Sequence, residues 1–153
     1  YKKLLYFERG NDILVLMIYT ISSIKDLSEL AQNFQQQDLT HFLLEWDIGI
    51  GKTQFVKEFV QHLGGDNQQV QSPSYSYINT YASDQGDIVH IDMYRLENPD
   101  DLQDKGILEA IDQYDIVFIE RPRREYYYAD ESWTKLVFER KNNTTRIITQ
   151  TDL

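Results

Sequence analysis

Residues 42–53 of this chain, FLLEWDIGIGKT, place a short apolar run directly before a glycine-rich segment that ends in lysine and threonine. The run Phe42-Leu43-Leu44 has the length and flanks of a buried strand. After the glycines, apolar residues recur at helical spacing over residues 54–63, and Gly64 and Gly65 follow where a helix end favours positive φ. Strand, glycine loop and helix in this order predict a phosphate-binding loop, because the first amides of a helix lack intrahelical partners.

Each residue type in this loop suits one part of a nucleotide such as ATP or ADP. Glycines let the backbone approach a ligand closely. Lys52 would reach the β- and γ-phosphates, and the Thr53 hydroxyl would ligate Mg²⁺. The usual pattern starts with a glycine where this chain has Trp46, so the alternative is a chance Gly-x-Gly-Lys-Thr in a loop. The residues predicted to bind nucleotide are Gly49, Ile50, Gly51, Lys52, Thr53 and Gln54.

Strands and helices are predicted to alternate along the chain. Short strands are expected at residues 18–21, 39–45, 75–81, 88–91 and 115–119. Helices are expected after Ser23, over 54–63, from Pro99 and over 107–114. Asp26, three residues after Ser23, predicts a capping box in which Asp replaces the usual Glu. Residues 136–140 and 146–149 predict a closing hairpin. The expected fold is α/β, a P-loop NTPase-like three-layer sandwich with a central mixed, mostly parallel sheet and a C-terminal β-hairpin.

Residues 1–17 end at Met17 and are half basic and half apolar. We expect them to be an N-terminal extension, either native or an artefact of cloning or of the assigned start. Residues 18–153 are predicted to form one P-loop ATPase domain, because no repeat or linker divides them.

Composition narrows the possible functions. The chain has 153 residues, no cysteine and a formal net charge of −10, so disulfides, thiolate metal sites and cysteine nucleophiles are excluded. The longest early apolar run, residues 13–18, is too short to span a bilayer, and we expect a cytoplasmic protein that binds no membrane. An acidic chain repels nucleic acid, so we expect no DNA binding and, if the chain serves a nucleic-acid pathway, contact with RNA only through partner proteins.

Three further segments complete a pattern with the glycine loop: SPSYS at residues 72–76, HIDMYR at 90–95 and IERP at 119–122. In order and spacing, the four segments resemble the TsaE (YjeE) family of bacterial P-loop ATPases over residues 18–149. The resemblance implies a protein that binds ATP, hydrolyses it slowly with Mg²⁺, and is required with TsaD and TsaB to threonylcarbamoylate adenosine 37 of tRNA. It implies an accessory subunit and weak ATPase, not the transferase itself.

The resemblance also implies roles for residues of this chain. Thr53 and Glu120 would hold Mg²⁺, and Asp92 would lie near the γ-phosphate to orient water or support the metal. Lys52, Asp92 and Glu120 are thus the expected catalytic residues. Independently, a carboxylate at the end of an apolar strand, such as Glu120, suits a cation that prefers oxygen ligands. The serines expected to line a nucleotide-responsive loop are Ser72, Ser74 and Ser76.

Plainer interpretations remain open for these residues. Asp92 could only cap a turn beside Arg95. Glu120 could be a surface carboxylate at a strand end, and the serine segment could be a turn made rigid by proline. His90 is expected to be a packed, hydrogen-bonded residue and not a catalytic base.

The chain departs from the family pattern at three positions. Trp46 replaces the first glycine, Arg121 replaces a tryptophan, and Leu27 stands where a threonine near the nucleotide is usual. Trp46 and Arg121 both follow strand ends, so we predict that they stack as a cation–π pair. The basic residues 121–124 and tyrosines 126–128 could contact RNA, although a solvated or partner-facing loop is the simpler interpretation.

Two alternative functions fit the same glycine loop. A small-molecule P-loop kinase would need an acceptor pocket and an arginine-rich lid, which only residues 121–124 could supply. A non-hydrolysing binding module would have a P-loop impaired by Trp46.

Overall fold

The computed structural model describes residues 2–9, 12–45, 50–123, 129 and 132–152. Its strands are β1 Lys2–Arg9, β2 Asp12–Ile21, β3 His41–Glu45, β4 Ile78–Tyr81, β5 Ile88–Asp92, β6 Ile116–Glu120, β7 Thr134–Arg140 and β8 Arg146–Asp152. Its helices are α1 Ile24–Gln36, α2 Lys52–His62, the 3₁₀ turn η1 Asn67–Gln69, α3 Asp101–Asp104 and α4 Ile107–Gln113. No helix in these ranges has the length and apolar character that crossing a membrane requires.

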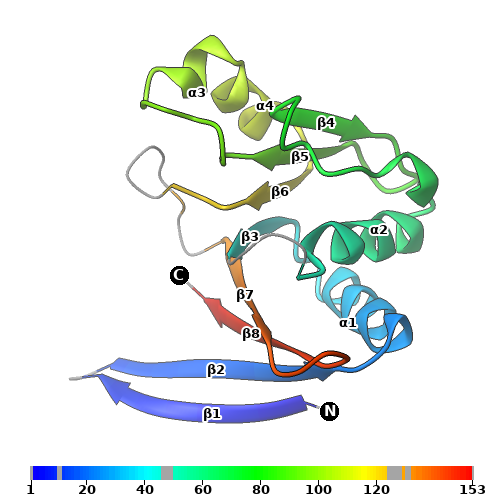
Figure 1. The fold of residues 1–153 in the computed structure, drawn as a ribbon, viewed down its shortest axis with the longest axis vertical. Helices are drawn as coiled ribbons and strands as arrows, with labels where there is room; N and C mark the ends of the chain where they lie inside the picture. Colours follow the sequence, from blue (N-terminus) through cyan, green and yellow to red (C-terminus); the bar gives the residue numbers. More distant parts are fainter. Residues whose placement is uncertain (1, 10–11, 46–49, 124–128, 130–131, 153) are drawn as a thin grey trace.

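The strands form one mixed sheet, with parallel pairing at its centre (Figure 1). The strand order is β1-β2-β8-β7-β3-β6-β5-β4. β3 pairs in parallel with β7 and β6, and β6 pairs in parallel with β5, whereas the other pairs are antiparallel. The predicted α/β class, the mixed sheet and the closing hairpin, β7 and β8, are confirmed. The sheet is not, as was predicted, mostly parallel, because parallel pairing is confined to its centre.

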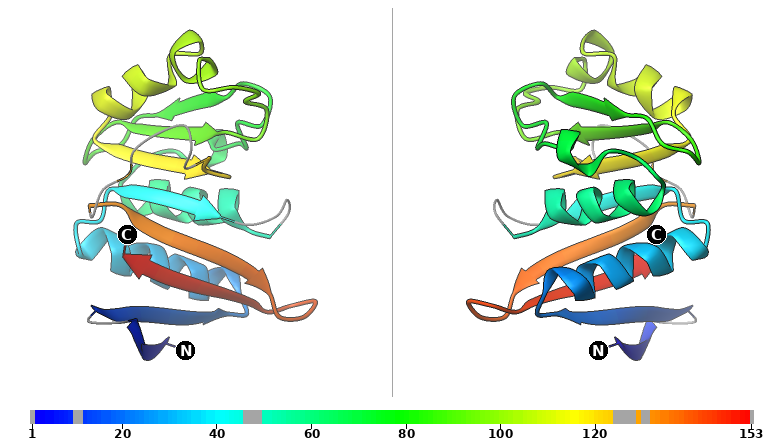
Figure 2. Two further views of the ribbon diagram at one scale, coloured as in Figure 1. Left: turned by 90° about the vertical axis from the view of Figure 1, so that its left-hand side faces the viewer. Right: turned by 90° about the vertical axis from the view of Figure 1, so that its right-hand side faces the viewer.

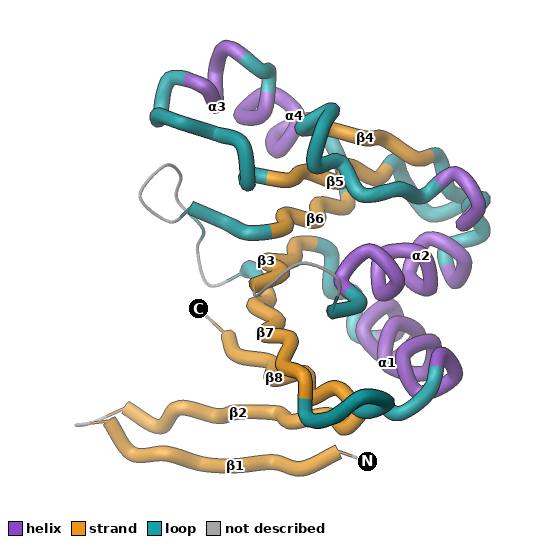
Figure 3. The backbone as a smooth tube through the Cα atoms, viewed as in Figure 1, coloured by secondary structure: helices purple, strands orange, loops and turns teal. Residues whose placement is uncertain are grey.

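Alternate side chains of the central strands face two different cores. On β3, Phe42 and Leu44 belong to the core that α1 and α2 cover, whereas Leu43 belongs to the core on the other face. Leu102 of α3 and Ile107 of α4 pack into that second core. Figure 2 shows α1 and α2 together over one face, and Figure 3 shows α3 and α4 at the end of the sheet formed by β4 and β5. The three-layer arrangement is therefore confirmed.

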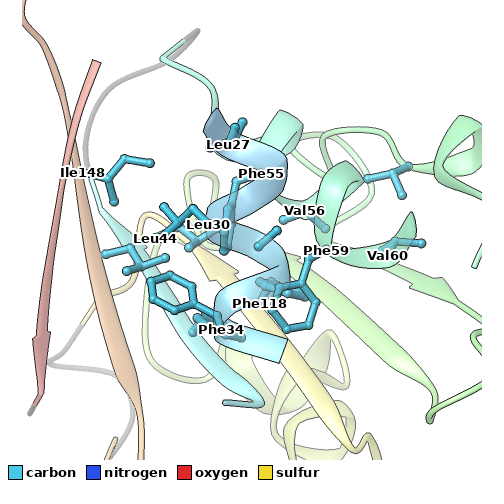
Figure 4. Packing of buried hydrophobic residues seen from close by; sticks show 14 of the residues in the cluster. Leu27, Leu30, Phe34, Leu44, Phe55, Val56, Phe59, Val60, Phe118 and Ile148 are labelled. Carbon is cyan, nitrogen blue, oxygen red and sulfur yellow. The ribbon is translucent and has the colours of Figure 1, made fainter. Parts of the chain in front are cut away.

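Phenylalanines fix α2 against the central strands (Figure 4). Phe42 and Phe118 lie on neighbouring strands and stack with ring centroids 4.9 Å apart. Phe55 and Phe59 of α2 contact this pair edge-on. All four side chains are buried. Because such rings contribute large apolar area and a defined geometry, they hold the beginning of α2 beside the end of β3.

The helix ends follow the sequence rules. Ser23 Oγ accepts a hydrogen bond from the Asp26 amide, and the Asp26 carboxylate accepts one from the Ser23 amide, so the predicted capping box of α1 is confirmed. Gly64, just after α2, has φ of +84°, the conformation expected at that helix end.

Several predicted boundaries differ from the structure. The strand expected over residues 75–81 begins only at Ile78, because Tyr77 has φ of +66° and donates its N–H to the Pro73 carbonyl in a turn. The helix expected from Pro99 begins at Asp101. The strand predicted over residues 18–21 is the last part of the longer β2, so the boundary expected after residue 17 falls inside a continuous strand.

Candidate functional site

The ends of three parallel strands and the beginning of α2 meet at one edge of the sheet. Glu120, the last residue of β6, is in register with Leu44 of β3 on one side and with Asp92 of β5 on the other. Because side chains alternate along a strand, Asp92 and Glu120 point to the same face as Phe118, which is the face that α2 covers. The carboxyl edge of an open α/β sheet is where such folds bind ligands.

The backbone at the beginning of α2 requires a glycine. Gly51 has φ of +113°, a conformation that residues with a side chain rarely adopt. The first helical bond of α2 runs from the Phe55 amide to the Gly51 carbonyl, over 2.9 Å. The amides of residues 52–54 precede it and so have no intrahelical acceptor, which makes this end suitable for an anion.

Glu120 is the centre of a polar cluster that is mostly buried. Thr53 Oγ1 donates to Glu120 Oε1 over 3.0 Å, and His90 Nε2 lies 3.0 Å from the same oxygen. Lys52 Nζ lies 3.9 Å from Glu120 Oε2. Lys52 is 4% exposed and Glu120 3%, so the interpretation of Glu120 as a surface carboxylate is wrong. The cluster places a cation, a hydroxyl and a carboxylate together beside the first turn of α2.

His90 lies behind Glu120 and fixes its orientation. The ring is fully buried, and its Nδ1 lies 3.4 Å from the Tyr81 hydroxyl. That hydroxyl donates to the Gln71 carbonyl over 3.1 Å. This position agrees with the prediction that His90 is packed and hydrogen-bonded.

Asp92 accepts four hydrogen bonds. Arg121 Nε donates to its Oδ1 over 3.0 Å, and Arg121 Nη2 donates to Oδ2. The Tyr94 amide donates to Oδ1 over 3.0 Å, and Ser74 Oγ donates to Oδ2 over 2.5 Å. Burial by itself would raise the pKa of Asp92, but the bonds from Arg121, Ser74 and Tyr94 outweigh it and hold this pKa below its usual value.

Asp92 does cap a turn, through the Tyr94 amide, but its charged partner is not Arg95. The Arg95 guanidinium carbon lies 4.3 Å from the centre of the Tyr75 ring instead. Arg121 is the residue that forms the ion pair with Asp92.

Arg121 is held in place along its whole length. Its backbone has φ of +53°, which is uncommon for a residue with a side chain, and its amide donates to the Leu44 carbonyl over 3.0 Å. Its guanidinium carbon lies 4.3 Å from the centre of the Tyr94 ring, within cation–π range. Trp46, the partner predicted for Arg121, lies outside the described residues, so that pairing stays a prediction.

Two neighbouring cavities open at this edge. One has a volume of about 330 Å³ and is lined by Lys52, Thr53 and Glu120 of the cluster, by Gln54, Ser72, Ser74 and Arg121, and by Ile50 and Gly51. The other, of about 260 Å³, shares Ile50, Gly51 and Gln54 and continues to α1 and the β7–β8 hairpin. We call them the polar cleft and the apolar cavity.

The polar cleft brings together most of the residues predicted for the site. Ile50, Gly51, Lys52, Thr53, Gln54 and Glu120 line it, and Asp92 adjoins it through Ser74 and Arg121. Gly49, also predicted to bind nucleotide, lies outside the described residues. Of the three serines, Ser72 and Ser74 line the cleft, whereas Ser76 donates to Asn79 Oδ1.

Sequence reasoning missed two parts of this site. The pairing of Arg121 with Asp92 was not predicted, because Arg121 was expected to stack on Trp46, although an arginine directly after a strand-end glutamate is a signal of a charged site. Sequence reasoning also gave no role to the β7–β8 hairpin, whose Phe138, Thr144, Arg146 and Ile148 form one wall of the apolar cavity. A sequence contains no local signal for such a long-range wall.

Comparison with known proteins gives one consistent result. A family model described as threonylcarbamoyl adenosine biosynthesis protein TsaE matches residues 21–148. The tRNA threonylcarbamoyladenosine biosynthesis protein TsaE of Rickettsia felis is 34% identical over 98 residues, which cover 63% of this chain and 56% of that protein. The protein of the same name from Bacillus subtilis is 31% identical over 108 residues, which cover 71% and 66%. The chain therefore spans less than two thirds of the length of these relatives.

A solved structure shares the fold. The crystal structure of YdiB from Bacillus subtilis superposes with a TM-score of 0.67, covering 93% of this chain and 88% of that chain at 19% sequence identity.

Proposed function

This chain belongs to the threonylcarbamoyl adenosine biosynthesis protein TsaE family, and we propose that it binds ATP with Mg²⁺ and acts in the biosynthesis of threonylcarbamoyladenosine in tRNA. The cluster of buried Lys52 and Glu120 with half-buried Thr53 at the beginning of α2 is the observation that carries the proposal. A triphosphate requires converging amides, a positive charge and a divalent cation. The first turn of α2 offers the amides, and Lys52 offers the positive charge. Thr53 and Glu120 offer oxygen ligands for the divalent cation.

The donor set fits Mg²⁺. Thr53 and Glu120 offer a hydroxyl and a carboxylate whose oxygens lie 3.0 Å apart. Mg²⁺ commonly takes only one or two protein ligands and completes its shell with water and phosphate oxygens. Within the described ranges no group of three or more His, Cys, Asp or Glu side chains is arranged to hold a metal. When bound, Mg²⁺ would neutralise negative charge on the phosphates.

The protein's own residues would divide the remaining tasks. The amides of residues 52–54 and Lys52 would hold the phosphates, while His90 keeps the Glu120 carboxylate oriented. Asp92 remains the residue expected near the γ-phosphate.

We place the nucleoside in the apolar cavity. Ile50, Gly51 and Gln54 line both cavities, so one ligand could fill the two together. Apolar side chains with a few polar groups are typical of such pockets. Leu27 lies on the wall of this cavity and offers only apolar contact, so the base would be held by packing there.

The place of this chain in tRNA modification is proposed from the family. We expect an accessory protein of the cytoplasm with weak ATPase activity that acts on proteins of the TsaD and TsaB type, which would themselves bind the tRNA. The net charge of −10 supports a role through partner proteins, since an acidic chain binds polyanions poorly by itself.

The first experiment measures ATP binding and turnover with Mg²⁺, by calorimetry and phosphate release. Lys52→Ala should lose at least about tenfold in affinity, because a charged contact to phosphate is removed. Lys57→Ala, the same change on α2 outside the polar cleft, is the matched control. Equal affinities for the wild type and Lys52→Ala would contradict the proposed site.

The second experiment tests the pathway. The wild type and Lys52→Ala are each added to a reconstituted reaction of TsaD- and TsaB-type partners with tRNA, and modified adenosine is quantified. We expect repeated turnover only with the wild type. Phosphate transfer to a metabolite would instead favour the kinase, and ATP binding only after Trp46→Gly would favour the impaired module.

A further inference from the structure

Arg121 presents one unused end to the polar cleft. Asp92 occupies the Nε–Nη2 edge of its guanidinium, and Nη2 also donates to Ser74 Oγ over 2.7 Å. Nη1 donates no hydrogen bond to any residue that the structure describes. The group lines the cleft together with Lys52 and Thr53, and its side chain is 16% exposed. Two N–H donors on a fixed planar fork are therefore available to an oxygen ligand in the cleft.

The order of the strands places this fork away from the phosphates that α2 would hold. β6 lies between β3, the strand that precedes α2 in the sequence, and β5, which carries Asp92. Adjacent strands lie about 4.8 Å apart. The guanidinium pairs with Asp92 on the β5 side, so it lies beyond Glu120 when viewed from the α2 side. A phosphate chain that starts at the α2 amides and continues past Thr53 and Glu120 would end near Arg121.

Asp92 has no acceptor position left for a water molecule. A carboxylate has about four lone-pair sites, and Arg121, Ser74 and the Tyr94 amide fill them. In this arrangement Asp92 positions Arg121 and Ser74. The group that faces the cleft is the arginine, which carries a planar guanidinium.

We propose that Arg121 binds the terminal phosphate of ATP and thereby makes this site prefer ATP over ADP, an inference that rests on the proposed function. Asp92 and Tyr94 act as positioning residues: they hold the guanidinium by one edge and one face and leave the Nη1 end for the γ-phosphate. Preorganisation of this kind favours the longer nucleotide, since ADP has no group that reaches this fork.

The test compares the affinities of the full chain for ADP and for a non-hydrolysable ATP analogue, both with Mg²⁺, by calorimetry. We expect Arg121→Gln to bind the analogue at least about tenfold more weakly and ADP within about twofold of the wild type. The affinity of Arg121→Lys for the ATP analogue should lie between those of the wild type and Arg121→Gln, because lysine keeps the positive charge but lacks the planar pair of N–H donors. Arg123→Gln, the same loss of charge two residues later and outside the cleft lining, should change neither affinity.

A measurement on the wild type makes the test independent of variant stability. The Nε resonance of Arg121, assigned by its loss in Arg121→Lys, should shift with the ATP analogue and stay in place with ADP. An equal loss of affinity for both nucleotides in Arg121→Gln, or an unchanged affinity for the analogue, would overturn the inference while leaving the proposed function intact. A wild type that binds neither nucleotide would overturn the proposed function and this inference with it.

Discussion

Asp92 and Glu120 are register partners at the ends of β5 and β6, and each carboxylate is paired with a different cation. Glu120 lies beside Lys52, which begins α2, whereas Asp92 holds Arg121, the residue that directly follows Glu120. The two ion pairs are therefore neighbours on one edge of the sheet, although Lys52 and Arg121 are far apart in sequence. This arrangement gives the polar cleft two cations whose positions are fixed before any ligand arrives.

Gly51→Ala should lower both stability and nucleotide affinity. A Cβ at this position would meet no atom within 4 Å, so the cost comes from φ of +113° and amounts to about 1–2 kcal/mol in the free energy of unfolding. Gly106→Ala is the matched control, because Gly106 also precedes a helix with positive φ, +70°, and an open Cβ position. Urea unfolding should show a loss in both variants, and calorimetry a loss of ATP affinity only in Gly51→Ala. Unchanged ATP affinity in Gly51→Ala would contradict the role given to this loop.

Glu120→Gln should destabilise the protein even without nucleotide. Glu120→Gln removes a negative charge that stabilises the buried Lys52 ammonium, and breaking such a buried pair costs about 3 kcal/mol. Adding Lys52→Met to Glu120→Gln should recover part of this loss, since contacting residues are not additive. Urea unfolding of the single and double variants measures this coupling, with exposed Glu139→Gln as the control. Strict additivity would show that the two charges do not interact.

Asp92 should contribute stability that disappears in acid. Its pKa in the folded protein is below the ordinary value of 3.8, so the folded state favours the ionised form. Such a group stabilises the fold above its ordinary pKa, and this contribution is lost as the pH falls through the lowered value. The difference in unfolding free energy between the wild type and Asp92→Asn should be constant above about pH 5 and should shrink below about pH 4. A difference that did not change with pH would contradict this assignment.

Phe55→Ala should cost about 3–5 kcal/mol in the free energy of unfolding, because it leaves a cavity among packed rings. Phe55 contacts Phe34, Phe42 and Phe118, so its loss also loosens the beginning of α2. Ile24→Ala, at a side chain that is 63% exposed, should cost less than about 0.5 kcal/mol. Thermal or urea unfolding checks both values, and similar losses in the two variants would refute this account of the core.

The sequence predicted those helix ends and strands that depend on neighbouring residues alone. The Ser23–Asp26 capping box, the end of α2 at Gly64 and the strand that ends in Glu120 each depend on residues within one turn or one strand. The strand predicted to begin at Tyr75 failed because alternation continues through a turn that Tyr77 closes with positive φ. A period of two residues does not by itself distinguish a strand from such a turn.

The sequence by itself determined the order of strand, glycine loop and helix, and with it the positions of Lys52 and Thr53 at the beginning of α2, where we propose that phosphate binds. These residues act through short-range backbone geometry, which a dozen neighbouring residues specify. Only the tertiary structure decided which cation pairs with which carboxylate, since that depends on β5 and β6 lying side by side in parallel register. It joined Arg121 to Asp92 and Ser74, and placed the β7–β8 hairpin beside the apolar cavity. Contacts between residues far apart in sequence follow from sheet order and packing, and no short segment encodes them.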